Sequence, residues 1–329
     1  MVTLDAIRGP VAQELEEFDA FVRRNFKVEN ELLSGMVDYI LSSRGKGVRP
    51  LLVLLSAALN APAGGRGIGQ RTYLAAMLVE IIHTASLIHD DVIDEADTRR
   101  GRASANAKWQ SRNAVVLGDY LLARNMELGM RSGQYDLVSY VIASIATLCE
   151  GELLQSDRAE RMEITRDAYL EIIYKKTASL LGISAGVGAL SAGANREQVA
   201  RMRRFGDALG MAFQIQDDIL DFTRGAETGK PSNNDLREHK ITLPLLLLLD
   251  RADAARRDEL LALLARCRED DDAVEYLRSV VENEGGLTFA AEVMQSYVTR
   301  AVEMLADYED SEYRSALINL CAYIAERDR

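Results

Sequence analysis

Proline, cysteine and basic charge are scarce in this chain, and each shortage excludes a class of protein. Only five prolines occur among 329 residues, of which 48% are hydrophobic, and this composition suits long, well-packed helices. The three cysteines, Cys149, Cys267 and Cys321, are far apart and form no CxxC pair, so we expect reduced thiols and no disulfide framework. The net charge of −12 argues against a nucleic-acid partner, because nucleic-acid phosphates need a basic surface.

The sequence also contains no linker, no apolar signal core and no long apolar run. Neither a Ser- or Pro-rich tract nor a block of like charge divides it, so we predict a single domain over residues 1–329. Residues 1–19 are acidic and unlike a signal peptide. The longest apolar runs, Leu51–Leu59 and Leu243–Leu249, are too short to cross a bilayer. We therefore expect a cytoplasmic protein without a transmembrane segment.

Helical periodicity dominates the pattern of apolar residues, and no convincing alternation marks a strand, which predicts an all-α fold. The glycine-rich segment 60–70 fits no phosphate-binding loop and is interpreted as a surface turn. Segment 98–104 is expected to be irregular, and segment 223–239 is interpreted as a mobile lid. Helices are predicted near residues 10–26, 29–42, 50–60, 71–96, 110–131, 135–158, 166–193, 197–224, 241–250, 255–267, 271–284, 287–307 and 311–327.

The most informative feature is an acidic motif that occurs twice. DDVID (90–94) and DDILD (217–221) both read DDxxD, and each ends an apolar helical run. Residues i and i+4 share a helical face, so the first and last aspartates of each motif repel one another. A hard divalent cation relieves that repulsion, and Mg²⁺ typically binds one or two carboxylates while sharing its other positions with water and phosphates. The repeat predicts two acidic walls across a cavity, with a metal-bridged diphosphate between them.

Basic residues occur where a diphosphate would need them. Lys46 and Arg49 precede Pro50 at a predicted helix N-terminus, where backbone N–H groups and the helix dipole favour phosphate. Arg99 and Arg100 come directly after the first acidic motif. Either pair alone would be an ordinary surface feature, but their clustering around the aspartates favours a phosphate site.

Histidines and nucleophiles contribute less to the interpretation. His83 lies seven residues before Asp90 on the same helical face, although a lone histidine on an apolar helix is often a core residue. His89 adjoins the aspartates, but no cysteine or further histidine completes a zinc set. No Ser/His/Asp or Cys/His set is evident, so covalent catalysis is not expected.

These segments together resemble the trans-isoprenyl diphosphate synthase (polyprenyl synthetase) family. A lone DDxxD is a weak signal, whereas two copies with matching flanks are a strong one. The resemblance implies the isoprenoid synthase fold, a single large bundle of long helices around a central cavity, usually as a homodimer. It runs from about Gly45 to Pro244 through GKGVRP (45–50), HTASLIHDDVIDEADTRRG (83–101), GDYLLAR (118–124), GELLQ (151–155), KKTASL (175–180), FQIQDDILD (213–221) and GKPSNNDLREHKITLPL (229–245).

The resemblance also implies roles for individual residues. The main Mg²⁺ ligands would be Asp90, Asp94 and Asp217, with support from Asp91, Asp218 and Asp221. The isopentenyl diphosphate head group would be held by Lys46, Arg49, His83 and Arg100. The allylic diphosphate, for example farnesyl diphosphate, would be held by Arg99, Lys176, Lys230 and Lys240. Thr177 and Gln214 would line the reacting carbons, and Glu152 and Gln155 would support the metals. The chain departs from the family pattern at Arg44, Gly47, Asn233 and His239, the last two being positions where a glycine is common.

The implied activity is that of a trans-polyprenyl diphosphate synthase. Such a Mg²⁺-dependent prenyltransferase ionises an allylic diphosphate, joins the cation head-to-tail to isopentenyl diphosphate, and loses a proton to the departing diphosphate. Ala85 and Ser86 lie roughly one turn deeper than Asp90, where short-chain members often carry an aromatic floor. These small side chains predict an open tunnel and a product in the heptaprenyl to decaprenyl range, expected to serve as a quinone side chain. The alternative is that they only permit close helix packing.

Three other functions compete with this interpretation. A terpene cyclase shares the bundle and one DDxxD, but its second metal motif is usually built from Asn/Asp, Ser/Thr and Glu. A non-catalytic subunit of a two-component synthase would usually lack the aspartates. A helical scaffold would leave both the repeated motif and the clustered cations unexplained.

Overall fold

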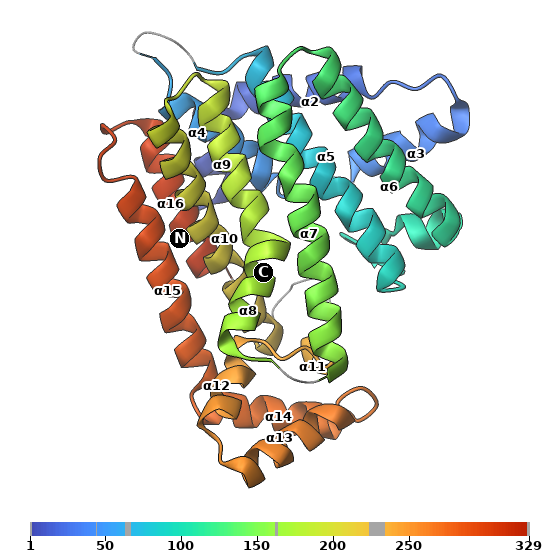
Figure 1. Cartoon of the computed structure of the whole chain (residues 1–329), viewed down its shortest axis with the longest axis vertical. Helices are drawn as coiled ribbons and strands as arrows, with labels where there is room; N and C mark the ends of the chain where they lie inside the picture. Colours follow the sequence, from blue (N-terminus) through green and yellow to red (C-terminus); the bar gives the residue numbers. More distant parts are fainter. Residues whose placement is uncertain (1, 44, 63–66, 162–163, 224–233, 328–329) are drawn as a thin grey trace.

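The computed structural model describes residues 2–43, 45–62, 67–161, 164–223 and 234–327, which are helical apart from one short hairpin and the connections (Figure 1). Arg44, Lys230, Asn233 and most of the predicted lid lie outside the described residues. The elements are α1 (Leu4–Arg8), a 3₁₀ turn (Gly9–Val11), α2 (Ala12–Asn25), α3 (Glu31–Ser42), α4 (Val48–Leu59), α5 (Gln70–Ile93), β1 (Thr98–Arg99), β2 (Arg102–Ala103), α6 (Ala105–Arg131), α7 (Tyr135–Arg161), α8 (Arg166–Ile173), a π turn (Tyr174–Ala178), α9 (Ser179–Ser191), α10 (Arg196–Phe222), α11 (Asn234–Arg237), α12 (Leu243–Arg251), α13 (Ala254–Arg266), α14 (Asp271–Asn283), α15 (Gly286–Met304) and α16 (Glu312–Glu326).

Many of these helices begin at a polar side chain that binds the free N–H groups of the first turn. Ser104 accepts a hydrogen bond from the backbone N–H of Ala107 at 2.9 Å, which starts α6. Asn195 and Gln198 form a reciprocal pair that starts α10. Such caps satisfy N–H groups that have no partner within the helix. The same role is taken by Thr3, Asn30, Thr165, Asp253, Asp270 and Ser311.

The centre of the bundle is α9, which is buried along nearly its whole length and packs against α4, α7 and α10. Two glycines let α10 approach it closely. A Cβ atom at Gly206 would lie 2.4 Å from the carbonyl oxygen of Leu181, and one at Gly210 would lie 2.4 Å from the Cα of Ala178. Residues 214 and 218 continue this i, i+4 row, so the close packing positions them beside the π turn.

The all-α prediction is confirmed, and most predicted helices lie within a few residues of the observed ones. The prediction that the chain contains no β-strand was wrong in one short segment. Segment 98–104 is a two-stranded hairpin that turns at Arg100 (φ 54°) and Gly101 (φ 73°). Positive φ at both central residues is what a tight hairpin requires. A short helix, α11, also lies within the segment interpreted as a lid.

Two predicted helices are interrupted. The run predicted at 110–131 begins at Ala105, and Gln110 breaks it with a φ of 68°. The run predicted at 166–193 contains the π turn at Tyr174–Ala178, a feature often found at functional sites. The first predicted helix, 10–26, is preceded by α1 and the 3₁₀ turn, which contains Pro10.

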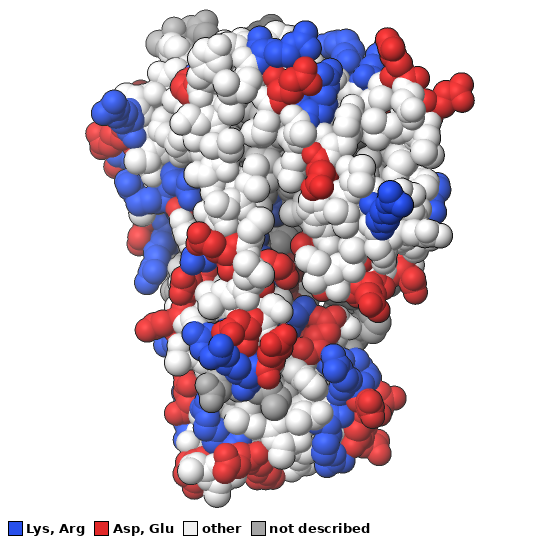
Figure 2. All heavy atoms as spheres, turned by 45° about the vertical axis from the view of Figure 1, so that its right-hand side comes forward, with Lys and Arg blue, Asp and Glu red and all other residues white. Residues whose placement is uncertain are grey.

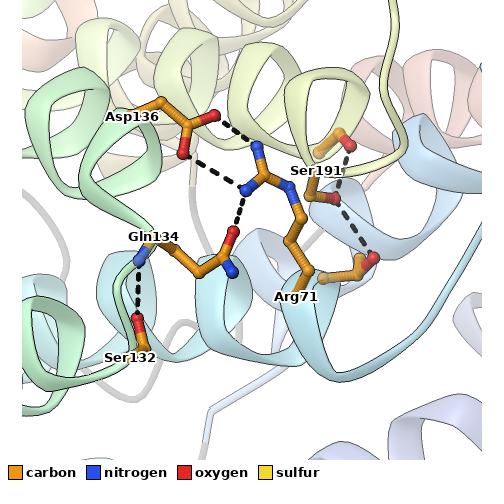
Figure 3. Close-up of polar contacts among 7 residues, drawn as sticks. Arg71, Ser132, Gln134, Asp136 and Ser191 are labelled. Carbon is orange, nitrogen blue, oxygen red and sulfur yellow. Dashed lines mark hydrogen bonds and ion pairs between the residues drawn. The ribbon is translucent and has the colours of Figure 1, made fainter.

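A polar cluster fixes the bundle where α5 begins (Figure 3). Arg71 donates hydrogen bonds to Gln134 and Asp136, which lie where α6 connects to α7. Ser191, at the end of α9, bonds the hydroxyl of Thr72 at 3.1 Å. These contacts tie α5, α7 and α9 together at the ends opposite the acidic motif of α5.

Two of the described helices, α5 and α7, are long and apolar enough to cross a bilayer by length and composition. The apolar window of α5 is 67% buried inside the protein, whereas that of α7 is only 28% buried. Core helices of soluble proteins pass the same test. The expectation of no transmembrane segment therefore stays a prediction.

Candidate active site

Both acidic motifs line one cavity, which has a volume of about 610 Å³. The first motif ends α5, and the second ends α10. Cations from six parts of the chain line the same cavity: Lys46, Arg49, Arg99, Arg100, Arg158, Lys176, Lys240 and Arg327. Its aspartates are Asp90, Asp94, Asp217, Asp218, Asp221 and Asp235. The structure thus brings the predicted acidic walls and most of the predicted phosphate-binding residues together.

Asp91 is the aspartate of the two motifs that does not line this cavity. Its side chain is buried and lies 2.5 Å from a terminal nitrogen of Arg99, whose Nε also donates to it at 2.7 Å. Arg99 itself does line the cavity. Asp91 therefore orients a phosphate-binding candidate.

Burial and like charge make Asp90 reluctant to ionise. Burial, with the nearby carboxylates of Glu152 and Asp94, raises the pKa of Asp90 to about 6, against the attraction of Lys176 and Arg99. In the second motif, burial and then Asp235 raise the pKa of Asp218 well above its usual value. In both residues burial is the main reason why the ionised form of the carboxyl group is disfavoured.

A chain of hydrogen bonds runs from the π turn through α10 to α8. The Thr177 hydroxyl donates to the side-chain oxygen of Gln214 at 2.8 Å, and the Gln214 amide donates to Asp218 at 3.0 Å. The hydroxyl of Tyr169 donates to the other oxygen of Asp218 at 2.6 Å. Two donors therefore fix the orientation of a buried carboxylate in the second motif.

The predicted head-group residues Lys46, Arg49, His83 and Arg100 all line the cavity, the first two at the start of α4. Gly47 precedes the helix in a left-handed conformation (φ 60°). Burial lowers the pKa of Arg49 to about 10, which still leaves it charged at neutral pH. Burial, and next the charge of Arg49, lower the pKa of His83 well below its usual value, so His83 is a neutral imidazole beside arginines. Arg100 donates to the carbonyl of Ser43 at 2.9 Å.

Two of the predicted allylic-side lysines, Lys176 and Lys240, are among the described residues, and both are paired with acids. Lys176, in the π turn, lies 2.7 Å from Glu152 of α7. Gly151 allows this proximity, because a Cβ there would lie 2.8 Å from the backbone nitrogen of Lys176. Lys240 pairs with Glu238. Gln155 lines the cavity, whereas Glu152 lies behind Lys176 and does not.

Asp221 and His239 shape the short helix α11. Asp221 accepts hydrogen bonds from the backbone N–H groups of Asn234 and Asp235, both at 3.1 Å, so it caps that helix. After the helix, His239 has a φ of 58°, and the backbone N–H groups of His239 and Lys240 return to Leu236 and Asp235. This is the Schellman arrangement, in which the left-handed residue is usually glycine. His239 thus takes the strained position of a glycine.

The sequence reasoning missed several cavity residues, among them Arg327, Tyr169 and Arg158. Arg327, just after α16, pairs with Asp217, donates to the carbonyl of Phe213 at 2.9 Å and lies 4.0 Å from the Phe213 ring. No local pattern pointed to it. Tyr169 and Arg158 carried a weak signal, because Arg158 is one turn past Gln155 and Tyr169 is two turns before Lys176.

The chain-length residues lie apart from the cavity lining. Ala85 is fully buried, and Ser86 is partly buried with its hydroxyl bonded to the carbonyl of His83 at 2.9 Å. Neither lines the described cavity. The tunnel beneath the first motif stays a prediction.

The donor set fits a divalent cation. Carboxylates from both motifs line the same cavity, and Asp217 already forms an ion pair with a cation, Arg327. Among the described residues, no group of three or more Asp, Glu, His or Cys side chains forms a ready-made metal site. A cation held here would therefore complete its shell with water or phosphate oxygens, as Mg²⁺ commonly does.

Comparison with known proteins identifies relatives along nearly the whole chain. The model of the polyprenyl synthetase family matches residues 30–281. The chain is 34% identical to the all-trans-nonaprenyl-diphosphate synthase (geranyl-diphosphate specific) of Rhodobacter capsulatus, over 98% of this chain and 97% of that protein. It is 33% identical to the short chain isoprenyl diphosphate synthase of Methanothermobacter thermautotrophicus, over 91% of each. The polyprenyl synthase of Caulobacter crescentus, solved with calcium and isoprenyl diphosphate, superposes with a TM-score of 0.90 at 29% identity, covering 99% of this chain and 98% of that one.

Proposed function

This chain belongs to the polyprenyl synthetase family, and we propose that its two acidic motifs and the cations around them form the active site. The chain is a prenyltransferase that lengthens an allylic diphosphate with isopentenyl diphosphate. The observation that carries the assignment of the site is the shared cavity. One cavity is lined by aspartates of both DDxxD motifs, by the cations at the start of α4, and by Lys176 with Thr177 of the π turn.

The residues divide the work between two diphosphates. On one side, Lys46, Arg49 and Arg100 hold isopentenyl diphosphate at the N-terminus of α4. On the other, Arg99 and Lys176 hold the allylic diphosphate against the acidic motifs. Each cation there stabilises negative charge as the C–O bond breaks.

The allylic cation then forms beside oxygen atoms that are already oriented. The Thr177 hydroxyl and the Gln214 amide are fixed by their mutual bond and by Asp218. The apolar side chains Leu87, Leu181 and Phe213 also line the cavity and exclude water from the cation. The double bond of isopentenyl diphosphate attacks the cation, and the released diphosphate accepts the proton that is lost.

A divalent metal, which we propose to be Mg²⁺, would be held by Asp90, Asp94 and Asp217. When bound, it supplies Lewis-acid stabilisation of the diphosphate leaving group. Burial holds Asp90 in a partly protonated state near pH 6, so this residue becomes a ligand only when it ionises.

We assign a long-chain product, in the heptaprenyl to decaprenyl range, to the small residues Ala85 and Ser86. Relatives named as octaprenyl and nonaprenyl synthases, and one named as component 2 of a heptaprenyl diphosphate synthase, support this range. A quinone side chain is the proposed use of the product.

A single incubation tests the proposed function. Purified chain, farnesyl diphosphate, isopentenyl diphosphate and Mg²⁺ should yield products lengthened by whole isoprene units, measured by mass spectrometry. Asp217→Asn should reduce the rate at least roughly 100-fold, because a cation-binding carboxylate is lost. The matched change Asp136→Asn, in the Arg71 cluster, should leave the rate unchanged. Consumption of farnesyl diphosphate without isopentenyl diphosphate would instead indicate a cyclase, and inactivity of the pure chain would indicate a missing subunit.

We further propose a cytoplasmic homodimer that associates through α6 and α7. Large apolar side chains are exposed on these two helices, among them Val116 at 61% and Leu153 at 73%. In Figure 2 much of the upper half of the molecule is white, with charged side chains gathered along its top edge. An uncovered apolar surface of this kind favours a second copy of the chain. Val116→Glu should give monomers in light scattering, and an unchanged dimer would exclude this interface.

A further inference from the structure

Arg158 is a cavity residue that the assigned reaction does not yet use. It lies near the end of α7, three residues after Gln155, and both residues line the cavity. Residues three apart are neighbours on a helix surface, so Arg158 continues the wall that Gln155 begins. It lies six residues beyond Glu152, which is roughly 9 Å along the helix axis.

The guanidinium of Arg158 has no partner among the described residues. Its Nε is enclosed without a hydrogen bond, and it takes part in no ion pair or hydrogen bond within that part of the chain. Three other cavity cations are paired: Arg99 with Asp91, Lys176 with Glu152, and Arg327 with Asp217. Arg49, on the α4 side, shares with Arg158 an enclosed Nε that has no hydrogen bond. Since only Nε is enclosed, the two terminal nitrogens remain accessible. A partly buried cation without a counter-ion is unfavourable unless a ligand supplies one.

The anion that fits is the diphosphate of the allylic substrate. Arg158 is on α7, the helix whose Glu152 pairs with Lys176. Helix α8, whose Tyr169 donates a hydrogen bond to Asp218, packs against α7. The other candidate anion, isopentenyl diphosphate, belongs to the α4 side of the cavity. A guanidinium binds phosphate oxygens with two parallel N–H groups, which suits this position.

We propose that Arg158 is a further diphosphate-binding residue, which holds the allylic diphosphate and its released pyrophosphate beside the second acidic motif. This inference rests on the proposed function, because it takes the diphosphate to be the ligand of the cavity. It adds a residue from the end of α7 to the site.

Arg158→Gln, with Arg161→Gln as the matched control, tests the inference. Arg161 is on the same helix but is 62% exposed, pairs with Asp157 at 2.7 Å and does not line the cavity. Arg158→Gln should weaken binding of inorganic pyrophosphate with Mg²⁺, measured by calorimetry, and raise KM for farnesyl diphosphate, each roughly 10- to 100-fold. KM for isopentenyl diphosphate should not change. Arg158→Lys should recover part of the loss, and Arg161→Gln should match the wild type.

Several results would overturn the inference. Wild-type pyrophosphate affinity and KM values in Arg158→Gln would show that the residue does not touch the ligand. A rise in KM for isopentenyl diphosphate alone would place Arg158 on the wrong side. If Arg158→Gln did not fold, a folded Arg158→Lys with wild-type constants would refute a role for the two-pronged contact. A wild-type chain that binds pyrophosphate but elongates nothing would refute the proposed function, while the calorimetric comparison would still test Arg158.

Discussion

Tyr169→Phe isolates the hydrogen bond that orients the second acidic motif. The Tyr169 hydroxyl is buried and lies 2.6 Å from Asp218, whose side chain is also buried. A hydrogen bond to a charged group contributes about 1.5–3 kcal/mol. Removing it leaves Gln214 as the one remaining side-chain donor to Asp218 among the described residues, and therefore raises the pKa of Asp218 further. If cation binding needs this carboxylate ionised and oriented, the Mg²⁺ concentration for half-maximal activity should rise roughly 10- to 100-fold.

The assay is product formation against Mg²⁺ concentration at pH 7, with the melting temperature measured without metal. Tyr174→Phe is the matched control, since its hydroxyl accepts from Arg203 at 3.3 Å and lies outside the cavity lining. A wild-type Mg²⁺ dependence in a folded Tyr169→Phe protein would refute the reasoning. An equal shift in Tyr174→Phe would show that altered packing, and not the bond to Asp218, is responsible.

Three further predictions follow from other parts of the structure. The folded-state pKa of Asp90 is raised from 3.8 to about 6, so its ionisation destabilises the metal-free protein as pH rises between these values. Cation binding requires the ionised form, so the half-saturating Mg²⁺ concentration in a thermal-shift titration should rise about tenfold per pH unit below pH 6. A half-saturating concentration that stays constant from pH 5 to 8 would contradict the assignment of Asp90 as a ligand. His239→Gly should stabilise the protein by about 0.5–1 kcal/mol in chemical denaturation, because glycine tolerates the positive φ, whereas His239→Val should destabilise it. Ala85→Phe should shorten the products seen by chromatography if the tunnel passes this residue, whereas unchanged products with a loss of about 1–3 kcal/mol would show that the site is only close-packed core.

Local sequence signals sufficed for the acidic motifs and for the start of α4. Both DDxxD sequences end helices whose apolar residues are easily recognised, and their i, i+4 spacing is a property of one helix. Pro50 and the glycines at 45 and 47 similarly mark the beginning of α4. In these places the residues that signal a feature lie within a few residues of that feature, so the sequence alone predicts it.

Contacts between distant segments could not be predicted in this way. The π turn arises where Gly151 lets α7 approach the backbone of Lys176, and nothing near residue 176 signals it. Arg327, just after α16, meets Asp217 although it is 110 residues further along the chain. The hairpin at 98–104 depends on Arg100 adopting a positive φ, which a non-glycine residue seldom does. Each of these features is set by tertiary packing, which overrides local propensity.

Asp217 and Lys176 are each paired with an opposite charge in the cavity, and this affects how ligands bind. Arg327 pairs with Asp217, so a divalent cation at Asp217 would compete with that guanidinium. The displacement is limited in cost because Arg327 keeps its bond to the Phe213 carbonyl and its contact with the Phe213 ring. The same reasoning applies to Lys176, which a phosphate oxygen would draw away from Glu152. When an anionic substrate and a metal cation bind together, the cation replaces Arg327 at Asp217 and the phosphate replaces Glu152 at Lys176. Either ligand alone would leave one partner of a broken ion pair, Arg327 or Glu152, without a counter-charge. Cooperative binding of metal and diphosphate therefore follows from the pairs seen in the cavity.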